Sequence, residues 1–401
     1  MFLSLAAALL ALGGSDRKPD VVTLQGGARL EGYVIYEDES SLVLRVGSRE
    51  RRLELNEVAE VRSATRSLAE LFAALDTRPP LGAGAHLDLA RFCRMRELDG
   101  ESALFAWGAI ASDPGCVEAH ELLGHRKRGS TWLAPVSGRW YPLEKLTELR
   151  RDWGRAWRLS TTHYRLRTNL PLREALDAAI DLERCYRIWF ALLGRELQME
   201  EVVEPLQVEI HADSVSFPES TGRGAYYDSA GRVLQVDASD GFERGTLVHE
   251  AVHQLLAATA ESPARSPSGE VPGWLDEGLA ELVRAGCTGA PGALRFDPAG
   301  RDQRHFALHR SEKKPYDLSR VLNFNPGDFA ASSRADLKYA QAYTLVDFCM
   351  SAEERRYRPS FIEFLRGVWR GQSSSTHFKN ALGLKDNEIE RAWTAWVAER
   401  P

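Results

Sequence analysis

His249 and His253, four residues apart with Glu250 between them, have the types and spacing best suited to chemistry in this chain. On a helix, residues four apart lie on one face, one turn apart, so both imidazoles can reach a single metal ion. A glutamate directly after the first histidine can serve as general base toward a metal-bound water. The pattern is typical of hydrolytic zinc sites, but a motif this short also arises by chance, so it needs support from a second segment.

That support comes from the segment that begins at Trp274, which predicts a second helix. A catalytic zinc takes three protein ligands and leaves one position for water, and Glu277 can supply the third ligand. Glu281 lies one turn further on the same face, where it can accept a hydrogen bond from a ligand histidine and fix its tautomer. The alternative is that both glutamates are ordinary helix-surface charges. Residues 259–271, rich in Ser, Pro, Ala and Gly, predict a surface loop between the two helices.

The combination of HExxH with a downstream W-L-x-E-G-x-A-E resembles the gluzincin superfamily of zinc metallopeptidases. It is most similar to a group of poorly characterised bacterial gluzincin-like proteins, and the resemblance covers residues 160–401. It implies one Zn²⁺ per chain with His249, His253 and Glu277 as ligands. It also implies hydrolysis of peptide bonds by a metal-activated water, with Glu250 as general base.

Residues 339–348 resemble the helix that carries a transition-state tyrosine in aminopeptidase-like gluzincins. Tyr339 lies at the matching place, and the resemblance implies that its hydroxyl donates to the oxyanion of the tetrahedral intermediate. The match is partial, because Gln341-Ala342 stand where aminopeptidases have Lys-Gly. The alternative for Tyr339 is a core aromatic, and Tyr343, one turn away, is the second candidate.

The surroundings of these motifs predict an α+β domain over residues 160–401, because strands are followed by helices without strict alternation. The predicted elements are strands at 163–168 and 206–211, a hairpin at 225–236, and helices at 172–193 and 243–258. The resemblance implies a thermolysin-like catalytic domain, in which the hairpin offers an edge strand to an extended substrate.

Two smaller regions precede this domain. Residues 20–63 alternate apolar and polar positions in short runs between turns, which predicts a small β-barrel similar to SH3-like or Sm-like barrels. Residues 66–150 predict a helical region and linker. The helices are expected at 67–76, 85–97, 101–112 and 116–125, and the linker at 129–142. The last two helices resemble a single tetratricopeptide-like hairpin.

The N-terminal residues 1–17 hold an apolar run of signal-peptide length, which predicts export to the periplasm, cell surface or medium. The run is too short to stay inserted in a membrane after processing, and the alternative is a buried N-terminal helix. A net charge of −6 argues against nucleic acid as the main partner. Five cysteines without CxxC spacing give no zinc-knuckle or redox motif, so we expect most of them to be buried small side chains.

Two other histidine pairs have spacings that could suggest a metal. His120 and His125 are five apart, which separates them by about 140° around a helix, so we expect an ordinary helix surface there. His305 and His309 have the four-residue spacing but no adjacent glutamate, so we expect a helix-face pair, exposed or with its hydrogen bonds satisfied. The alternative is a role near the cleft.

The sequence therefore favours a secreted zinc metallopeptidase that acts on a peptide or protein substrate, with N-terminal modules that could hold a protein partner. Two alternatives stay open: an inactive peptidase fold that serves as a binding or scaffold module, and hydrolysis of another bond by the same zinc-bound water.

Overall fold

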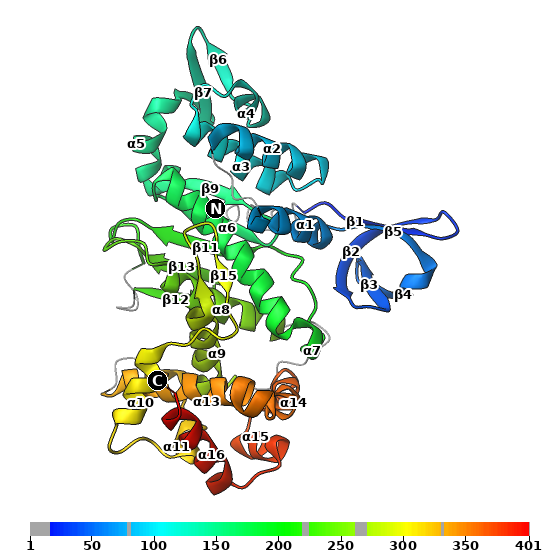
Figure 1. The fold of residues 1–401 in the computed structure, drawn as a ribbon. Helices are drawn as coiled ribbons and strands as arrows, with labels where there is room; N and C mark the ends of the chain where they lie inside the picture. Colours follow the sequence, from blue (N-terminus) through cyan, green and yellow to red (C-terminus); the bar gives the residue numbers. More distant parts are fainter. Residues whose placement is uncertain (1–16, 78–81, 219–223, 261–270, 330–332, 401) are drawn as a thin grey trace, which may run out of the picture. The chain divides into compact units, whose positions relative to one another are not determined.

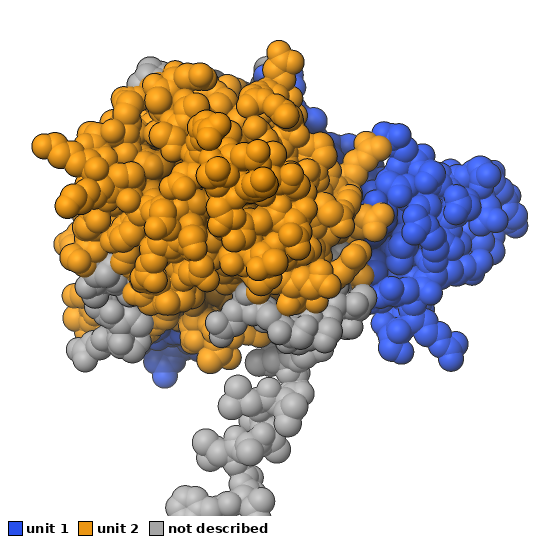
Figure 2. All heavy atoms as spheres, turned by 90° about the horizontal axis from the view of Figure 1, so that it is seen from below, with its two compact units in different colours: residues 1–179, 201–208 blue, residues 180–200, 209–401 orange. Residues whose placement is uncertain are grey.

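The computed structural model describes residues 17–77, 82–218, 224–260, 271–329 and 333–400 (Figure 1). The chain is a mixed α+β protein. It divides into unit 1, residues 1–179 and 201–208, and unit 2, residues 180–200 and 209–401 (Figure 2). The predicted signal peptide lies outside the described residues, apart from Arg17. Within the described ranges no helix is both long and apolar enough to cross a membrane.

Unit 1 opens with a five-stranded antiparallel sheet in the order β4-β3-β2-β1-β5. Its strands are β1 (Asp20–Leu24), β2 (Arg29–Glu37), β3 (Ser41–Val46), β4 (Arg49–Glu54) and β5 (Val58–Arg62). The alternation seen in the sequence directs one set of side chains inward, and Val22, Leu42 and Leu44 are fully buried in its core. The predicted sheet over residues 20–63 is thus present.

Helices follow the sheet in unit 1: α1 (Ala64–Thr77), α2 (Gly82–Met95), α3 (Asp99–Ser112) and α4 (Val117–Leu122). The main helical pair is α2 with α3 rather than the expected α3 with α4. A Cβ on Gly108 would lie 2.4 Å from Cδ2 of His86, so only glycine permits this close approach.

The linker predicted over residues 129–142 is wrong, because this segment belongs to a three-stranded antiparallel sheet in the order β6-β7-β8. Its strands are β6 (Arg126–Arg128), β7 (Thr131–Val136) and β8 (Arg139–Pro142). Ser137 and Gly138 have φ of 49° and 78°, as a two-residue type I′ hairpin turn requires. The Gly and Ser residues that suggested a linker are therefore the turns of short hairpins.

The rest of unit 1 is a short connection and a strand pair. The elements are η2 (Leu143–Lys145), α5 (Leu146–Arg151), η3 (Trp153–Arg155), β9 (Trp157–Ser160) and β10 (Tyr164–Thr168). The antiparallel register of β9 and β10 sets Arg165 opposite Ser160 and Thr168 opposite Trp157. The next helix, α6 (Leu172–Trp189), runs past the boundary at residue 179 and continues as η4 (Phe190–Gly194) and α7 (Arg195–Leu197).

In unit 2 the predicted hairpin is present as β12 (Ala225–Asp228) and β13 (Val233–Asp237), with Ala225 opposite Val236. Strand β13 lies between β12 and β11 (Leu206–His211), so β12 is an edge strand. The hairpin packs against α8 (Arg244–Ala260), the helix that carries the HExxH motif.

The centre of unit 2 is formed by α8, α9 (Gly273–Gly286) and α13 (Ala335–Arg355), with α10 (Gln303–Ser311) alongside α13 (Figure 1). A Cβ on Gly278 would lie 2.7 Å from the carbonyl oxygen of Ala342, so glycine allows α9 to pack directly on α13. The remaining elements are β14 (Cys287–Thr288), β15 (Arg295–Phe296), α11 (Leu318–Val321), α12 (Pro326–Phe329), α14 (Arg358–Val368), α15 (Ser375–Leu382) and α16 (Asp386–Ala398).

The five cysteines are unpaired thiols. Cys93, Cys185 and Cys349 are buried, as expected of small apolar side chains.

Candidate metal centre

Helix α8 turns its two motif histidines toward α9 while its large apolar side chains enter the core. Leu247, Val248 and Val252 are buried, whereas His249 and His253 are only partly so. His249 and His253 are about one helical turn apart along α8. Their side chains converge, so that the two Nε2 atoms lie 3.1 Å apart. The four-residue spacing therefore does bring both imidazoles to one point.

Helix α9 brings Glu277 to the same point. Its Oε2 is 3.2 Å from Nε2 of His249 and 3.5 Å from Nε2 of His253. The three side chains are 12%, 14% and 14% exposed for His249, His253 and Glu277, respectively. These residues form a group that is close enough to bind a metal ion.

The donor set fits a cation. Within the described ranges, Oε2 of Glu277 is buried and none of its contacts has hydrogen-bond geometry. A buried carboxylate oxygen without a hydrogen bond costs free energy unless another charge compensates it. A metal ion held jointly with the two histidine Nε2 atoms would supply that compensation.

Each histidine is oriented by a carboxylate at its other nitrogen. Nδ1 of His249 is 3.0 Å from Oε1 of Glu281, and Nδ1 of His253 is 2.6 Å from Oδ1 of Asp276. In the neutral form of each imidazole, Nδ1–H donates to the carboxylate and the lone pair of Nε2 is directed toward Glu277. Asp276 was missed by sequence reasoning, because it is adjacent to Glu277 and points about 100° away from it around the helix.

The electrostatics of the metal-free group are those of histidines held among carboxylates. Burial lowers the pKa of His249, but Glu277 and Glu281 outweigh burial and raise it to about 9. Burial raises the pKa of Glu277, whereas His249 and His253 lower it to about 2. Below the raised histidine pKa the imidazoles hold protons, and a metal needs their neutral form, so binding must release those protons.

A cavity of about 520 Å³ opens beside His249 in unit 2 and contains the side chains expected to act on a substrate. Glu250 and Tyr339 both line it. The ring of Tyr339 has its centroid 6.4 Å from that of His249 and 5.0 Å from that of Phe329. The structure thus brings the expected base and the first candidate tyrosine to the metal group.

Tyr343, the second candidate, lies elsewhere. It is fully buried, and its hydroxyl accepts a hydrogen bond of 3.0 Å from the backbone N–H of Asp302. Burial raises the pKa of this hydroxyl. Tyr343 therefore anchors the start of α10 and does not line the cavity.

The two histidines of α10 have different surroundings. Nε2 of His305 is 3.0 Å from Oε2 of Glu281, and His305 lines the cavity. His309 is buried, with Nδ1 2.9 Å from the hydroxyl of Thr344. Burial lowers the pKa of His309 to about 4. Glu281 thus bridges His249 and His305 through its two oxygens.

The pair His120 and His125 in unit 1 is buried, so the expectation of an ordinary helix surface is wrong. Helix α4 ends at Leu122, and Gly124 with φ of 66° turns the chain back. The two Nδ1 atoms lie 2.8 Å apart, and Nε2 of His120 is 2.9 Å from the carbonyl oxygen of Pro114. One imidazole therefore donates to the other, and the pair ties α4 to the chain that follows it.

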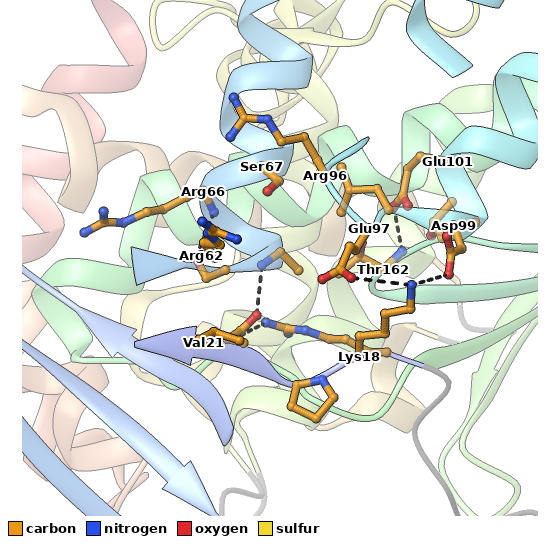
Figure 3. Close-up of a pocket in the computed structure, with 18 of the residues that line it drawn as sticks. Lys18, Val21, Arg62, Arg66, Ser67, Arg96, Glu97, Asp99, Glu101 and Thr162 are labelled. Carbon is orange, nitrogen blue, oxygen red and sulfur yellow. Dashed lines mark hydrogen bonds and ion pairs between the residues drawn. The ribbon is translucent and has the colours of Figure 1, made fainter. Parts of the chain in front are cut away.

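Unit 1 contains a larger cavity, of about 1130 Å³, lined largely by ion pairs (Figure 3). Nζ of Lys18 reaches Asp99 at 3.1 Å and Glu97 at 3.8 Å, and Nη2 of Arg17 is 2.9 Å from Asp20. Because these charges neutralise one another, this cavity is a weaker candidate for a catalytic site than the cavity beside His249.

No protein-family model and no curated protein matches this chain. The geometry of the metal group and its cavity is therefore the basis for a functional assignment.

Proposed function

We propose that residues 160–401 form a zinc metallopeptidase of the gluzincin type, which hydrolyses peptide bonds with Glu250 as general base. The observation that carries this proposal is the meeting of three ligand atoms, from His249, His253 and Glu277, beside a cavity that Glu250 lines. Two helices supply the ligands, and each histidine has its own orienting carboxylate.

Zinc is the cation that suits this donor set. Tetrahedral zinc holds nitrogen and oxygen ligands at about 2.0–2.2 Å, which separates neighbouring ligands by about 3.3–3.5 Å. The three separations here are 3.1, 3.2 and 3.5 Å. Two imidazoles and one carboxylate leave a fourth position for water. Calcium favours six or more oxygen ligands, which this group does not offer.

The chain's own residues can carry out the proton transfers of peptide hydrolysis. Zinc, when bound, makes a water nucleophilic near neutral pH and polarises the carbonyl under attack. Glu250 takes the proton of the attacking water and passes it to the leaving amine. The hydroxyl of Tyr339 donates to the developing oxyanion. The edge strand β12, which packs on α8, offers main-chain groups to an extended substrate.

We infer further that the protein is exported, on the basis of the N-terminal apolar run. In this proposal the N-terminal sheet of unit 1 is an SH3-like barrel, and a short helical region built on the pair α2 and α3 follows it. Together they hold a protein partner, while the substrate enters unit 2.

The direct test of this function uses the purified full chain and a mixed peptide library. We expect one zinc per chain by elemental analysis, and cleavage that is lost with a chelator and restored by zinc. Less than about half an equivalent of zinc in folded protein would contradict the metal assignment. Full zinc occupancy with an uncut library would instead favour the inactive scaffold.

Tyr339→Phe is expected to lower kcat by about 100- to 1000-fold with little change in KM, because it removes one oxyanion donor. Tyr343→Phe is the comparison, since its hydroxyl serves the backbone of Asp302 and not the cavity. We expect it to reduce stability by about 1 kcal/mol, because the partly buried N–H of Asp302 loses its partner, with a much smaller effect on kcat. Steady-state kinetics and thermal unfolding of both variants check this; the reverse pattern would assign the catalytic role to Tyr343.

A further inference from the structure

Two arginines line the cavity beside the metal group. Arg284 comes from α9 and Arg304 from the first turn of α10. Their side chains are 22% and 81% exposed, respectively, so Arg284 is largely enclosed and Arg304 extends into solvent. No part of the proposed proton transfers uses either of them.

Each arginine is held in place through one edge of its guanidinium. Nε and Nη2 of Arg284 contact Oε2 of Glu281 at 2.9 and 2.5 Å. Nε and Nη2 of Arg304 contact the two carboxylate oxygens of Asp302 at 3.2 and 2.9 Å. Nη2 of Arg284 also lies 3.4 Å from Oδ2 of Asp302, so a single carboxylate draws the two guanidinium groups together.

Among the residues that the structure describes, these contacts leave the Nη1 groups of both arginines for another acceptor. A guanidinium carries five N–H donors in a planar fork, and charged acceptors such as carboxylates are its preferred partners. Because Glu281 and Asp302 already fix the two side chains, a ligand would not have to order them on binding. The partial enclosure of Arg284 strengthens a charge-assisted hydrogen bond relative to one in open water.

Arg284 is connected to the metal group through Glu281. Nδ1 of His249 is 3.0 Å from one oxygen of Glu281, and Nη2 of Arg284 is 2.5 Å from the other. One carboxylate thus separates a ligand imidazole from a guanidinium. An extended peptide covers about 3.3–3.6 Å per residue, so a group bound at the arginines belongs to a residue a few positions from the cleaved bond.

We propose that Arg284 and Arg304 bind a carboxylate of the substrate, so that the site selects peptides with a negative charge close to the cleaved bond. This inference rests on the proposed peptidase function of the same site. The carboxylate has two possible sources in a peptide, the free C-terminus and the side chain of Asp or Glu. Both present the same planar acceptor to the two Nη1 groups.

The cavity also contains acidic side chains, which would favour a positively charged peptide instead of a carboxylate. Glu250 lies next to the metal ligands, and Asp336 is exposed at the start of α13. If these two carboxylates dominated recognition, the site would prefer peptides with a lysine. The charge preference of binding therefore separates the two outcomes.

The experiment measures binding without turnover, using the zinc-loaded full chain with Glu250→Gln and, so that the competing Glu250 carboxylate is also present, the chelator-treated unaltered chain. Fluorescently labelled alanine-rich peptides are compared as free acid and as C-terminal amide, and the amide is also made with an internal Glu, Gln or Lys. We expect the free acid or the Glu-containing amide to bind at least tenfold more tightly than its neutral counterpart, and which of them does identifies the source of the carboxylate. Equal affinity for all peptides, a preference for lysine, or no binding of any peptide would overturn the proposal.

The arginine variants locate the effect. Arg304→Gln and Arg284→Gln, each added to the Glu250→Gln chain, should remove most of the preference for the carboxylate peptide. Arg310→Gln on the same helix is the matched control, because Arg310 is exposed and does not line the cavity. A preference that survives both substitutions overturns the proposal. Because binding is measured without cleavage, a carboxylate preference in a chain that cuts no peptide would contradict the peptidase function alone.

Discussion

Glu250→Gln is expected to lower kcat for peptide cleavage by about 100- to 10,000-fold, the range for loss of a positioned general base. Glutamine keeps the shape of the side chain but cannot take a proton from the attacking water. The three ligand atoms come from His249, His253 and Glu277, so the variant should keep one zinc per chain. KM should change little, because the lost interaction belongs to the transition state.

The measurement pairs steady-state cleavage of one library-derived peptide with elemental analysis of the same sample. Glu243→Gln is the matched control, because Glu243 is exposed and directly precedes α8. An unchanged kcat in the Glu250 variant would remove this residue as the base. Loss of zinc together with activity would show that Glu250 supports the metal group rather than the proton transfer.

The parts of the site that lie within one helix could be predicted from spacing. His249 and His253 share a face of α8, and Glu277 and Glu281 share a face of α9, because residues four apart recur at each turn. The structure brings these four side chains together as the spacing suggests. The spacing brings the four side chains together only if the two predicted helices pack against each other. The apolar residues around the motif favour such packing.

What could not be predicted depends on how different elements meet. Asp276 reaches His253 only because α9 crosses α8 at this residue, and no intrahelical spacing contains that information. The same holds for Arg284 and His305, which share the second oxygen of Glu281. His305 lies on α10, and no local sequence pattern predicts how the segment between α9 and α10 places this helix beside Glu281.

In unit 1, too, local sequence patterns predicted one sheet and missed another. The alternation in residues 20–63 predicted a sheet, because side chains alternate faces along each strand and one face is buried here. The strands of residues 126–142 are three to six residues long, which is too short for an alternation of apolar and polar residues to be recognised in the sequence. Their two-residue turns were the usable signal, since Ser137-Gly138 separates two short runs with β-forming residues.

Glu277→Gln should lower the affinity for zinc by more than about 100-fold, which corresponds to about 2.7 kcal/mol. The substitution keeps the side-chain volume but replaces a charged ligand with a neutral amide, whose NH₂ group also cannot coordinate a cation. His249 and His253 then hold the metal alone, and two ligands do not complete a catalytic zinc site. Competition with a chromophoric chelator measures the change, and circular dichroism checks that the chain stays folded.

Asp276→Asn separates a ligand from an orienting residue. Asp276 contacts Nδ1 of His253 and not the metal position, so its loss should weaken zinc binding by only about 10- to 100-fold, as for other partners of ligand histidines. Asp240→Asn, at an exposed position in unit 2, is the control and should leave affinity unchanged. If Asp276→Asn costs as much as Glu277→Gln, Asp276 is itself a ligand. If Glu277→Gln binds zinc as tightly as the unaltered chain, the three-ligand group is wrong, and with it the premise that α9 completes the site begun by α8.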